Sequence, residues 1–352
     1  MSPGFLKAAL RDFEAYTPGQ QPPDGEDWVK LNTNESPWPP APSVLAAVRA
    51  AVGGELRLYP DPMAREARAA IAEFHRLPPQ WVSVGNGGDE LLTLAFRAFV
   101  GTGDAVAFLD PSYPLLASLA ALHEARANIH PLDAEWAPPK SFAEDDCVLK
   151  ILVNPNSPTG TWVGREAVRE VVESSPGVVV LDEAYVDFAP ADQVDLVRAG
   201  APNLIILRTF SKSYALAGMR LGYALAPPSL IDALDLVKDS YNLDRLAIVA
   251  ARAAILDAEY HDQLVAFVLS ERTWLESELR RRDFAVLPSA TNFLFCRPRS
   301  GAGAERLFLG LRERRVLVRH YDREPIQGWI RITIGTREQH QLMLSALDQL
   351  PG

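Results

Sequence analysis

GVVVLDEAY, residues 177–185, is one of six short apolar runs that decide the fold of this 352-residue chain. Amphipathic segments with apolar residues at helical spacing lie between such runs, as in ELLTLAFRAFV at 90–100 and REAVREVVES at 165–174. Buried strands that alternate with helices are typical of a mostly parallel sheet with helices on both faces. The sequence therefore predicts an α/β domain. The other five runs are WVSVG (81–85), AVAFLD (105–110), VLKILVNP (148–155), NLIILRTF (203–210) and LGYALA (221–226).

The segments that flank this domain have a different character. After Pro228, long helical stretches precede three strand-like segments, FLFCR (293–297), VLVRHY (316–321) and WIRITIG (329–335), which predict a smaller α+β domain. Before the sheet, Gly19 to Pro42 is dense in Pro, Gly and Asp and is typical of an extended arm. We expect an arm at 1–30 that packs on the small domain or a partner subunit, a large domain at 31–245 and a small C-terminal domain at 246–352.

Composition excludes several classes of protein. Hydrophobic residues make up 48% of the chain and charged residues 23%, which is globular composition, and no uncharged stretch is long enough to cross a bilayer. The formal net charge of -10 argues against a broad nucleic-acid surface. Cys147 and Cys296 are far apart, and the six histidines include no HExxH, so we expect no disulfide framework and no metal site. Charged residues interrupt the start of the chain before a long apolar stretch builds, so we expect a cytoplasmic protein.

GNGGDE, residues 85–90, lies where a predicted strand ends and a helix begins. Free backbone N–H groups and the helix dipole make such a place an anion site, so a phosphate could dock there. A dinucleotide fingerprint would need glycine at Glu90, and no GK[ST] follows as a P-loop requires. A plain glycine-rich turn is the alternative interpretation.

Asp182 stands at the carboxyl end of a run apolar enough to be a central strand, where ligands of open α/β sheets collect. A buried carboxylate is costly unless it is paired, and a protonated pyridine nitrogen would be such a partner. A helix N-cap or a magnesium-binding acid is the alternative.

Lys212 lies between two serines in TFSKSYALAGMRLGY, residues 209–223, directly after a predicted strand. A lysine at a strand end can form an imine with an aldehyde cofactor, while serine hydroxyls and the guanidinium of Arg220 bind the phosphate of that cofactor. A solvated loop lysine is the alternative, but it would not need these neighbours. With Asp182 and the glycine-rich turn, Lys212 indicates pyridoxal phosphate (PLP).

Eight motifs, in this order, resemble those of the fold-type I PLP enzymes and, within them, of the class II histidinol-phosphate aminotransferases. The resemblance covers almost the whole chain. The motifs are LNTNESPW (31–38), LYPDP (58–62), GNGGDELL (85–92), DPSYPLL (110–116), NPNSPTG (154–160), LDEAYVDF (181–188), RTFSKSYALAGMRLGY (208–223) and WIRITIGT (329–336).

The resemblance implies a role for each residue of a cofactor site. Lys212 would bind PLP as a Schiff base, Asp182 would pair with the pyridine nitrogen, and Tyr185 would donate to the phenolic oxygen. Tyr113 would stack on the ring. The residues that would hold the phosphate are Gly88, Asp89, Ser211 and Arg220, with Tyr59 reaching it from a neighbouring subunit of a homodimer with shared sites.

The resemblance also implies a substrate pocket. Arg331 would receive the anionic group of the substrate, and Tyr16 and Asn34 would line the same pocket. Without the resemblance, Arg331 on an alternating strand is interpreted as solvent-facing. The usual motif is PNNPTG, and here Ser157 replaces the asparagine before the second proline. Either Asn156 or Ser157 would bond the ring oxygen, and we prefer Asn156.

These residues predict transamination of L-histidinol phosphate with 2-oxoglutarate, in histidine biosynthesis. Lys212 would be displaced by the substrate amine and then move the proton between substrate and cofactor carbons, giving ping-pong kinetics. Two rival functions share the cofactor: an aromatic or broad-range amino-acid aminotransferase and a threonine-phosphate decarboxylase of the same branch. A rival of another class is a regulator with the same fold that binds its ligand without turnover.

Overall fold

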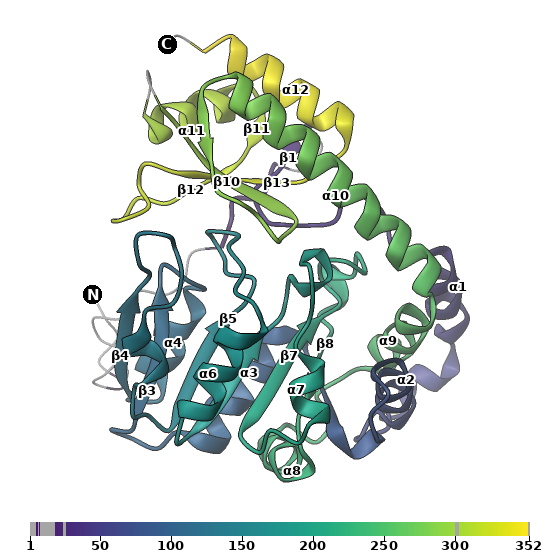
Figure 1. Cartoon of the computed structure of the whole chain (residues 1–352). Helices are drawn as coiled ribbons and strands as arrows, with labels where there is room; N and C mark the ends of the chain where they lie inside the picture. The colour runs from purple at the N-terminus through teal and green to yellow at the C-terminus, as the bar shows by residue number, and fades with distance from the viewer. Residues whose placement is uncertain (1–4, 6, 8–17, 24–25, 300–302, 351–352) are drawn as a thin grey trace.

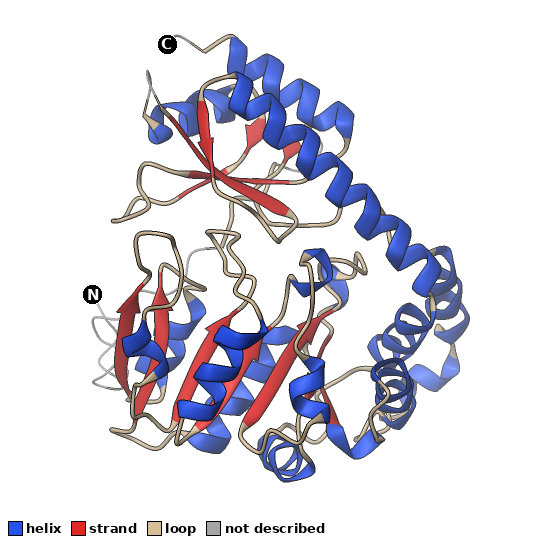
Figure 2. Cartoon of the chain, viewed as in Figure 1, coloured by secondary structure: helices blue, strands red, loops and turns tan. Residues whose placement is uncertain are grey.

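The computed structural model describes residues 5, 7, 18–23, 26–299 and 303–350, which form a large part and a smaller part (Figure 1). Helix α10 (Ala258–Arg281) runs along one side and joins the two. Figure 2 shows a sheet that lies between helices in the large part, and a second, smaller sheet that has helices on its outer side. The predicted α/β domain with a smaller α+β domain is confirmed.

The large sheet has seven strands in the order β2-β8-β7-β6-β5-β3-β4. All six apolar runs form strands of it, and β8 alone runs against the other six. The seventh strand, β4, was not predicted because its residues are polar and largely exposed at the sheet edge. The strands are β2 (Val82–Gly85), β3 (Ala105–Asp110), β4 (Arg126–Pro131), β5 (Leu149–Val153), β6 (Val178–Asp182), β7 (Leu204–Thr209) and β8 (Gly222–Leu225).

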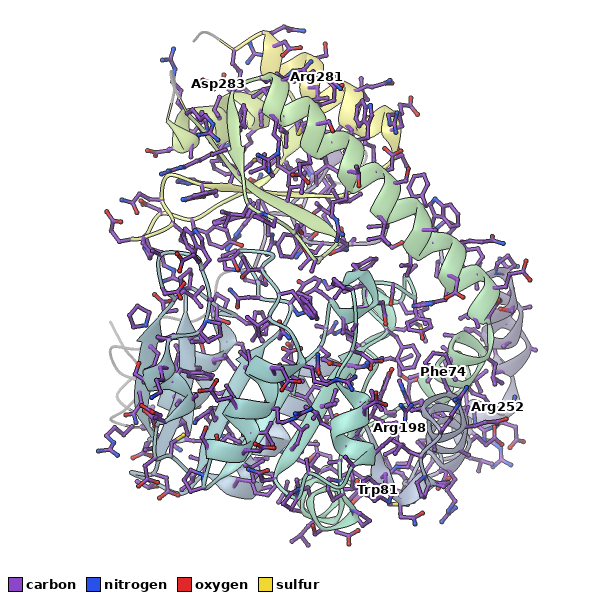
Figure 3. All side chains as sticks on the ribbon, in the orientation of Figure 1. Phe74, Trp81, Arg198, Arg252, Arg281 and Asp283 are labelled. Atoms are coloured by element: carbon purple, nitrogen blue, oxygen red, sulfur yellow. The ribbon has the colours of Figure 1, made fainter. Side chains whose placement is uncertain are left out.

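Successive strand residues pack on opposite faces of the sheet. Val179 and Leu181 of β6 join one core cluster with α2, α6 and α9, while Val180 between them joins another with α3, α4 and α8. Side chains fill both layers (Figure 3). The sheet is therefore buried on both faces, which explains its uninterrupted apolar runs. The helices of this part are α1 (Pro42–Ala51), α2 (Arg65–His75), α3 (Gly87–Phe99), α4 (Leu115–Leu122), α5 (Lys140–Ala143), α6 (Arg165–Ser174), α7 (Val194–Arg198), α8 (Pro228–Val237) and α9 (Arg245–Leu256).

The small part has an antiparallel sheet in the order β12-β13-β10-β9. All three strand-like segments of the C-terminal sequence contribute to its strands or to the short pair beside it. Helices α10 and α12 pack on it, and α12 begins with a capping box between Thr336 and Gln339. The elements are β9 (Phe284–Val286), β10 (Phe293–Pro298), β11 (Val316–Leu317), β12 (Arg319–His320), β13 (Ile330–Thr333), α11 (Ala304–Glu313) and α12 (Arg337–Asp348).

The N-terminal strand β1 (Val29–Lys30) pairs in parallel with β11, so this segment lies on the small part before the chain crosses to the large one. Leu31 packs in the small core. The chain passes back from the large part to the small part near α9 and α10. Helix α9 still shares the core of the large sheet with α1 and α2. We therefore propose to place the second domain boundary between α9 and α10 instead of at 245/246, with the N-terminal crossing near residue 35.

Candidate active site

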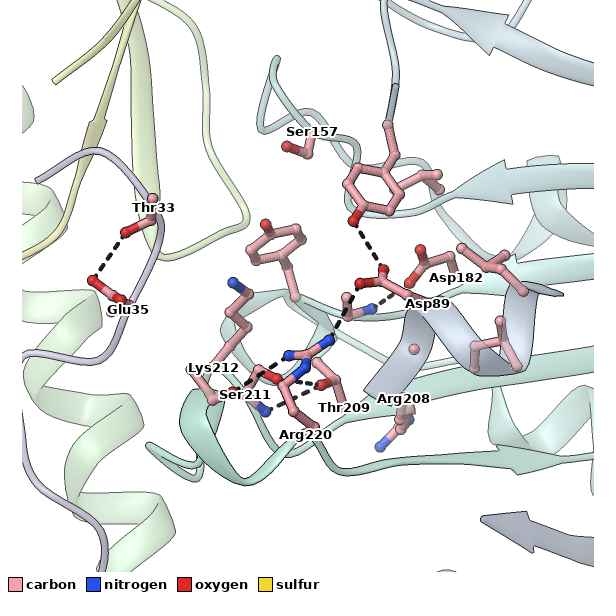
Figure 4. A pocket seen from close by; sticks show the side chains of 18 residues that line it. Thr33, Glu35, Asp89, Ser157, Asp182, Arg208, Thr209, Ser211, Lys212 and Arg220 are labelled. Carbon is pink, nitrogen blue, oxygen red and sulfur yellow. Dashed lines mark hydrogen bonds and ion pairs between the residues drawn. The ribbon is translucent and has the colours of Figure 1, made fainter. Parts of the chain in front are cut away.

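Two adjoining cavities lie between the carboxyl ends of the large-sheet strands and the small part, with volumes of about 250 Å³ and about 190 Å³. Both are lined by the same five side chains, so they are two halves of one site; Figure 4 shows the first of the two cavities. Ligands of open α/β sheets collect at this edge. The shared residues are Thr33, Tyr113, Ser157, Tyr185 and Lys212.

Lys212 lies in the turn after β7, and its Nζ is 5.7 Å from the centre of the Tyr185 ring. Burial and the positive charge of Arg331 lower the pKa of Lys212 to about 8, although Glu35 opposes them. A neutral amine is the form that attacks a carbonyl carbon, and a lowered pKa makes more of it available near neutral pH. The solvated loop lysine is therefore excluded.

Asp182 ends β6, is 9% exposed and accepts a hydrogen bond from the backbone N–H of Ala184 at 3.0 Å. Burial raises its pKa to about 6. Among the residues that the structure describes, no cationic side chain lies within ion-pair distance of its carboxylate. A ligand with a protonated ring nitrogen would supply that charge and hold the carboxylate ionised.

The first turn of α3 contacts Arg220 in the wall of the first cavity. Gly87 has φ +83°, and a Cβ there would lie 2.6 Å from Nη2 of Arg220. A Cβ on Gly222 of β8 would lie 2.8 Å from the carbonyl carbon of Gly87, so glycine is required on both sides of this contact. Gly88, Ser211 and Arg220 line the cavity beside the helix N-terminus. N–H groups, a hydroxyl and a guanidinium in one place suit a phosphate.

The Asp89 carboxylate is engaged by its neighbours. It accepts a hydrogen bond from the Tyr113 hydroxyl at 2.9 Å and pairs with Arg220 at 3.2 Å. A carboxylate repels a phosphate dianion. Asp89 therefore suits a phosphate through its backbone N–H at the start of α3, while its side chain orients Tyr113 and Arg220.

Tyr185 is buried, and its hydroxyl accepts a hydrogen bond from Nδ2 of Asn34 at 2.8 Å. Asn34 is held in turn by Thr333, whose hydroxyl donates to Oδ1 at 3.1 Å and accepts from the Asn34 backbone N–H at 3.0 Å. Asn34 has φ 56°, a left-handed conformation that asparagine tolerates better than most residues. The N-terminal segment thus fixes the direction of the Tyr185 hydroxyl.

Ser157, and not Asn156, lies in the walls of the two cavities. The Asn156 amide is taken up by Thr159 of its own loop and by a second loop, accepting from the Ser112 hydroxyl at 2.8 Å and donating to the Pro111 carbonyl and to Thr159. Ser157 Oγ accepts from Nη1 of Arg331 at 3.3 Å. The geometry therefore favours Ser157 over the Asn156 that we preferred from sequence, because the asparagine side chain has no free donor toward the cavity.

Arg331 is half-buried in the second cavity, where its Nη2 donates to the Asn32 carbonyl at 2.9 Å. Arg319 of β12 stands directly opposite it in the antiparallel register and lines the same cavity. Like charges at opposed positions disfavour a sheet unless something of the other sign lies near. The solvent-facing interpretation of Arg331 is excluded, and two guanidinium groups face the place where an anionic group would bind.

Sequence reasoning missed several cavity residues. Arg319 carried a signal, since it interrupts the apolar run VLVRHY as Arg331 interrupts WIRITIG. Arg323 pairs with Asp110 of the large part at 2.8 Å, and Glu35 accepts from Lys30 at 2.6 Å. The first contact joins distant segments, and the second lies in an extended segment without a periodic pattern. The missed cavity residues include Asn32, Thr33, Glu35, Arg319, Tyr321 and Arg323.

One expected site residue lies away from the cavities, and another is outside the described residues. Tyr59 lines neither cavity; it is 79% exposed and stacks on Tyr241 at 4.5 Å between ring centres. That position leaves the Tyr59 ring open to contact from a second subunit. Tyr16 lies outside the described residues.

The chain matches the family "Aminotransferase class I and II" over residues 26–347, and it belongs to that family. Within the family it is 42% identical to the histidinol-phosphate aminotransferase of Syntrophotalea carbinolica, covering 98% of this chain and 99% of that protein. It is 41% identical to the enzyme of the same name from Geotalea uraniireducens, with the same coverage.

The fold is similar to a solved histidinol-phosphate aminotransferase from Sinorhizobium meliloti in complex with pyridoxal-5'-phosphate. The TM-score is 0.87, with 28% sequence identity over 98% of this chain and 96% of that one. A threonine-phosphate decarboxylase from Porphyromonas gingivalis, at 23% identity and a TM-score of 0.76, shares the fold.

Two absences hold for the described residues. None of their helices is both long and apolar enough for a membrane span. The same residues contain no cluster of three or more His, Cys, Asp or Glu side chains that could hold a metal ion.

Proposed function

We propose that this chain is a PLP-dependent aminotransferase that moves the amino group of L-histidinol phosphate to 2-oxoglutarate. The opposed pair Arg319 and Arg331, in the same cavity as Lys212, is the observation that carries the choice of a donor with an anionic group. The names of the relatives at 41–42% identity support histidinol phosphate in particular. Small molecules are the substrates of this family, and we keep a cytoplasmic setting as part of the proposal.

The described residues fit the cofactor at three points. Asp182 is a buried acid that a cationic group of a ligand would stabilise. The start of α3, with Arg220 and Ser211, suits a phosphate, and Lys212 lines the same cavity as both. PLP, when bound, withdraws electrons from the substrate carbon next to the nitrogen. Asp182 would keep the ring nitrogen protonated, Tyr113 would cover the ring, and the hydroxyls of Tyr185 and Ser157 would lie near the ring oxygen.

Lys212 would act twice. Its neutral amine would hold the cofactor, and once the substrate amine has replaced it, the freed amine would carry a proton between carbon atoms. The pKa of about 8 suits this exchange, because both protonation states are accessible near neutral pH. Arg319 and Arg331 would hold the phosphate of the donor and then a carboxylate of 2-oxoglutarate.

The homodimer is part of the proposal. Four exposed side chains with large apolar parts lie close together in sequence or space: Leu56, Leu58, Tyr59 and Tyr241. If a second copy of the chain covered them, Tyr59 would lie near the phosphate site of that partner. Mixed dimers test this. Neither Lys212→Ala nor Tyr59→Ala should be fully active alone, but a mixed dimer has one site with both residues intact and should regain activity. No recovery in mixed dimers would contradict shared sites.

The function is tested with purified, PLP-saturated protein and 2-oxoglutarate against three donors: histidinol phosphate, phenylalanine and threonine phosphate. We expect glutamate formation to be fastest with histidinol phosphate. Brisk turnover of phenylalanine without turnover of histidinol phosphate would instead indicate an aromatic aminotransferase. Carbon dioxide release from threonine phosphate would indicate the decarboxylase, and no turnover of any amine would leave a ligand-binding regulator.

A further inference from the structure

A polar cluster lies behind the Lys212 turn and lines neither cavity. It joins Ser213 and Tyr214, which directly follow Lys212, to Asp187 in the 3-10 turn Val186–Phe188 and to His261 in the first turn of α10. Ser213 is 1% exposed and His261 has a side-chain exposure of 12%. Nothing in the roles proposed above uses these four residues.

The contacts converge on one carboxylate oxygen. The Ser213 hydroxyl donates to Oδ2 of Asp187 in a short hydrogen bond, and Nε2 of His261 lies 3.5 Å from the same oxygen. The His261 ring stacks on Tyr214, with 4.4 Å between ring centres and 28° between the planes. Asp187 thus receives one partner from the Lys212 turn and one from α10.

The charged neighbours of this oxygen shift the pKa values of both His261 and Asp187. Burial acts to lower the pKa of His261, but the Asp187 and Asp262 carboxylates outweigh it and raise that pKa above its ordinary value. Burial acts to raise the pKa of Asp187, but His261 and Arg208 outweigh it and bring that pKa to about 2. Nη1 of Arg208, on β7, is 4.0 Å from Oδ1 of Asp187. His261 and Asp187 therefore each favour the charged form of the other.

The cluster ties together three elements that each carry part of the site. Asp187 follows Asp182 and Tyr185 in the same segment, Ser213 adjoins Lys212, and α10 leads into the domain that bears Arg331. We propose that His261 is a positioning residue: paired with Asp187, it holds the Ser213 hydroxyl and so fixes the Lys212 turn against Tyr185. This inference rests on the proposed function for its kinetic test but not for its structural one.

The rival explanation is that the His261 ring merely fills space against Tyr214. Two variants separate the explanations. His261→Gln keeps a donor toward Asp187 and loses the aromatic ring, whereas His261→Phe keeps a ring on Tyr214 and loses the donor. Asp262→Asn is the matched control, because it removes the other acidic neighbour of His261, which lies 3.1 Å away and is 80% exposed, and leaves Asp187 intact.

With histidinol phosphate and 2-oxoglutarate, we expect His261→Phe to lower kcat by about tenfold with KM within about twofold, as expected when the reacting group is misplaced and binding is not. The midpoint pH of the visible cofactor band should also shift in His261→Phe. His261→Gln should retain kcat within about threefold of the wild type, and Asp262→Asn should be unaffected. Wild-type kcat and an unshifted band in His261→Phe would overturn the proposal, and so would a His261→Gln defect larger than that of His261→Phe.

A measurement on the cofactor-free protein needs no activity. With 13C-labelled histidine, the His261 resonance, identified by its loss in His261→Gln, should titrate above pH 6.5, and Asp187→Asn should lower its midpoint. A midpoint below pH 6.5, or one that Asp187→Asn does not move, would overturn the positioning role while leaving the proposed reaction standing. A wild type that transfers no amino group from histidinol phosphate would overturn the reaction and leave the ion pair intact.

Discussion

Replacing Arg319 by glutamine should weaken substrate binding without weakening the fold. Arg319 stands opposite Arg331, and like charges in that position disfavour a sheet by about 0.2–1 kcal/mol. Against this relief, the variant loses a hydrogen bond to the Pro18 carbonyl at 3.3 Å and a contact over the Tyr321 ring at 5.5 Å, which are of similar size. The free energy of unfolding should therefore change by less than about 1 kcal/mol.

The loss in binding should be larger. A charge-assisted contact with a doubly charged phosphate in a partly buried cavity is worth about 2–3 kcal/mol, the lower part of the range for such pairs. At about 1.4 kcal/mol for each factor of ten, KM for histidinol phosphate should rise by about 30- to 150-fold. Because the phosphate is held throughout the reaction, kcat should stay within about threefold.

The assay compares kcat/KM for histidinol phosphate with kcat/KM for histidinol, which lacks the phosphate. The preference for the phosphorylated donor should collapse in Arg319→Gln. Arg297→Gln is the control, because Arg297 lies on the same sheet over the Trp329 ring at 4.9 Å but lines neither cavity. If Arg319→Gln keeps the preference for the phosphorylated donor, or loses it only together with several kcal/mol of stability, the reasoning from the opposed arginines is refuted.

Three further predictions concern the cofactor half of the site. Lys212→Ala should abolish transamination and prevent borohydride from attaching the cofactor to this peptide; a labelled peptide elsewhere in the chain would contradict the role of Lys212. Asp182 has a folded pKa of about 6 against 3.8 unfolded, so its contribution to stability is complete below pH 3.8 and is lost as pH rises through 6. Urea unfolding of the cofactor-free protein should therefore show Asp182→Asn to be more stable than the wild type at pH 7 by about 2–3 kcal/mol. If the free energy of unfolding depends on pH equally in the two proteins, the raised pKa of Asp182 is contradicted. Ser157→Ala should shift the visible band of the bound cofactor with little change in melting temperature, whereas Asn156→Ala should lower the melting temperature by removing buried hydrogen bonds; the reverse pattern would restore Asn156 as the ring contact.

The strands of the large sheet and the candidate cofactor residues Asp182 and Lys212 follow from features that lie close together in sequence. An apolar run without polar interruption needs both faces covered, and Asp182 and Lys212 each come directly after such a run, where the carboxyl edge of a parallel sheet collects ligands. Strand β4 could not be predicted in this way, because an edge strand with exposed polar residues has no apolar pattern.

Contacts between distant segments could not be predicted in that way. The opposition of Arg319 and Arg331 depends on the register of two strands, which no single segment encodes. The choice between Asn156 and Ser157 depends on Ser112 and Pro111, residues of another loop that take up the asparagine amide. The packing of α9 on the large sheet likewise depends on α1 and α2, because a helix of this composition can pack on either domain.

The pairing of β1 with β11 gives synthesis of the chain a definite order. The ribosome makes Val29 long before its partner Val316, so the β1 segment waits while the whole large sheet is produced. Domains tend to fold as units during synthesis, and here the later domain needs a strand made first. Asn34, four residues after β1, orients the Tyr185 hydroxyl. A nascent chain could therefore assemble its large sheet before release, but it would complete the wall of its own active site only after the last strands of the small domain had formed.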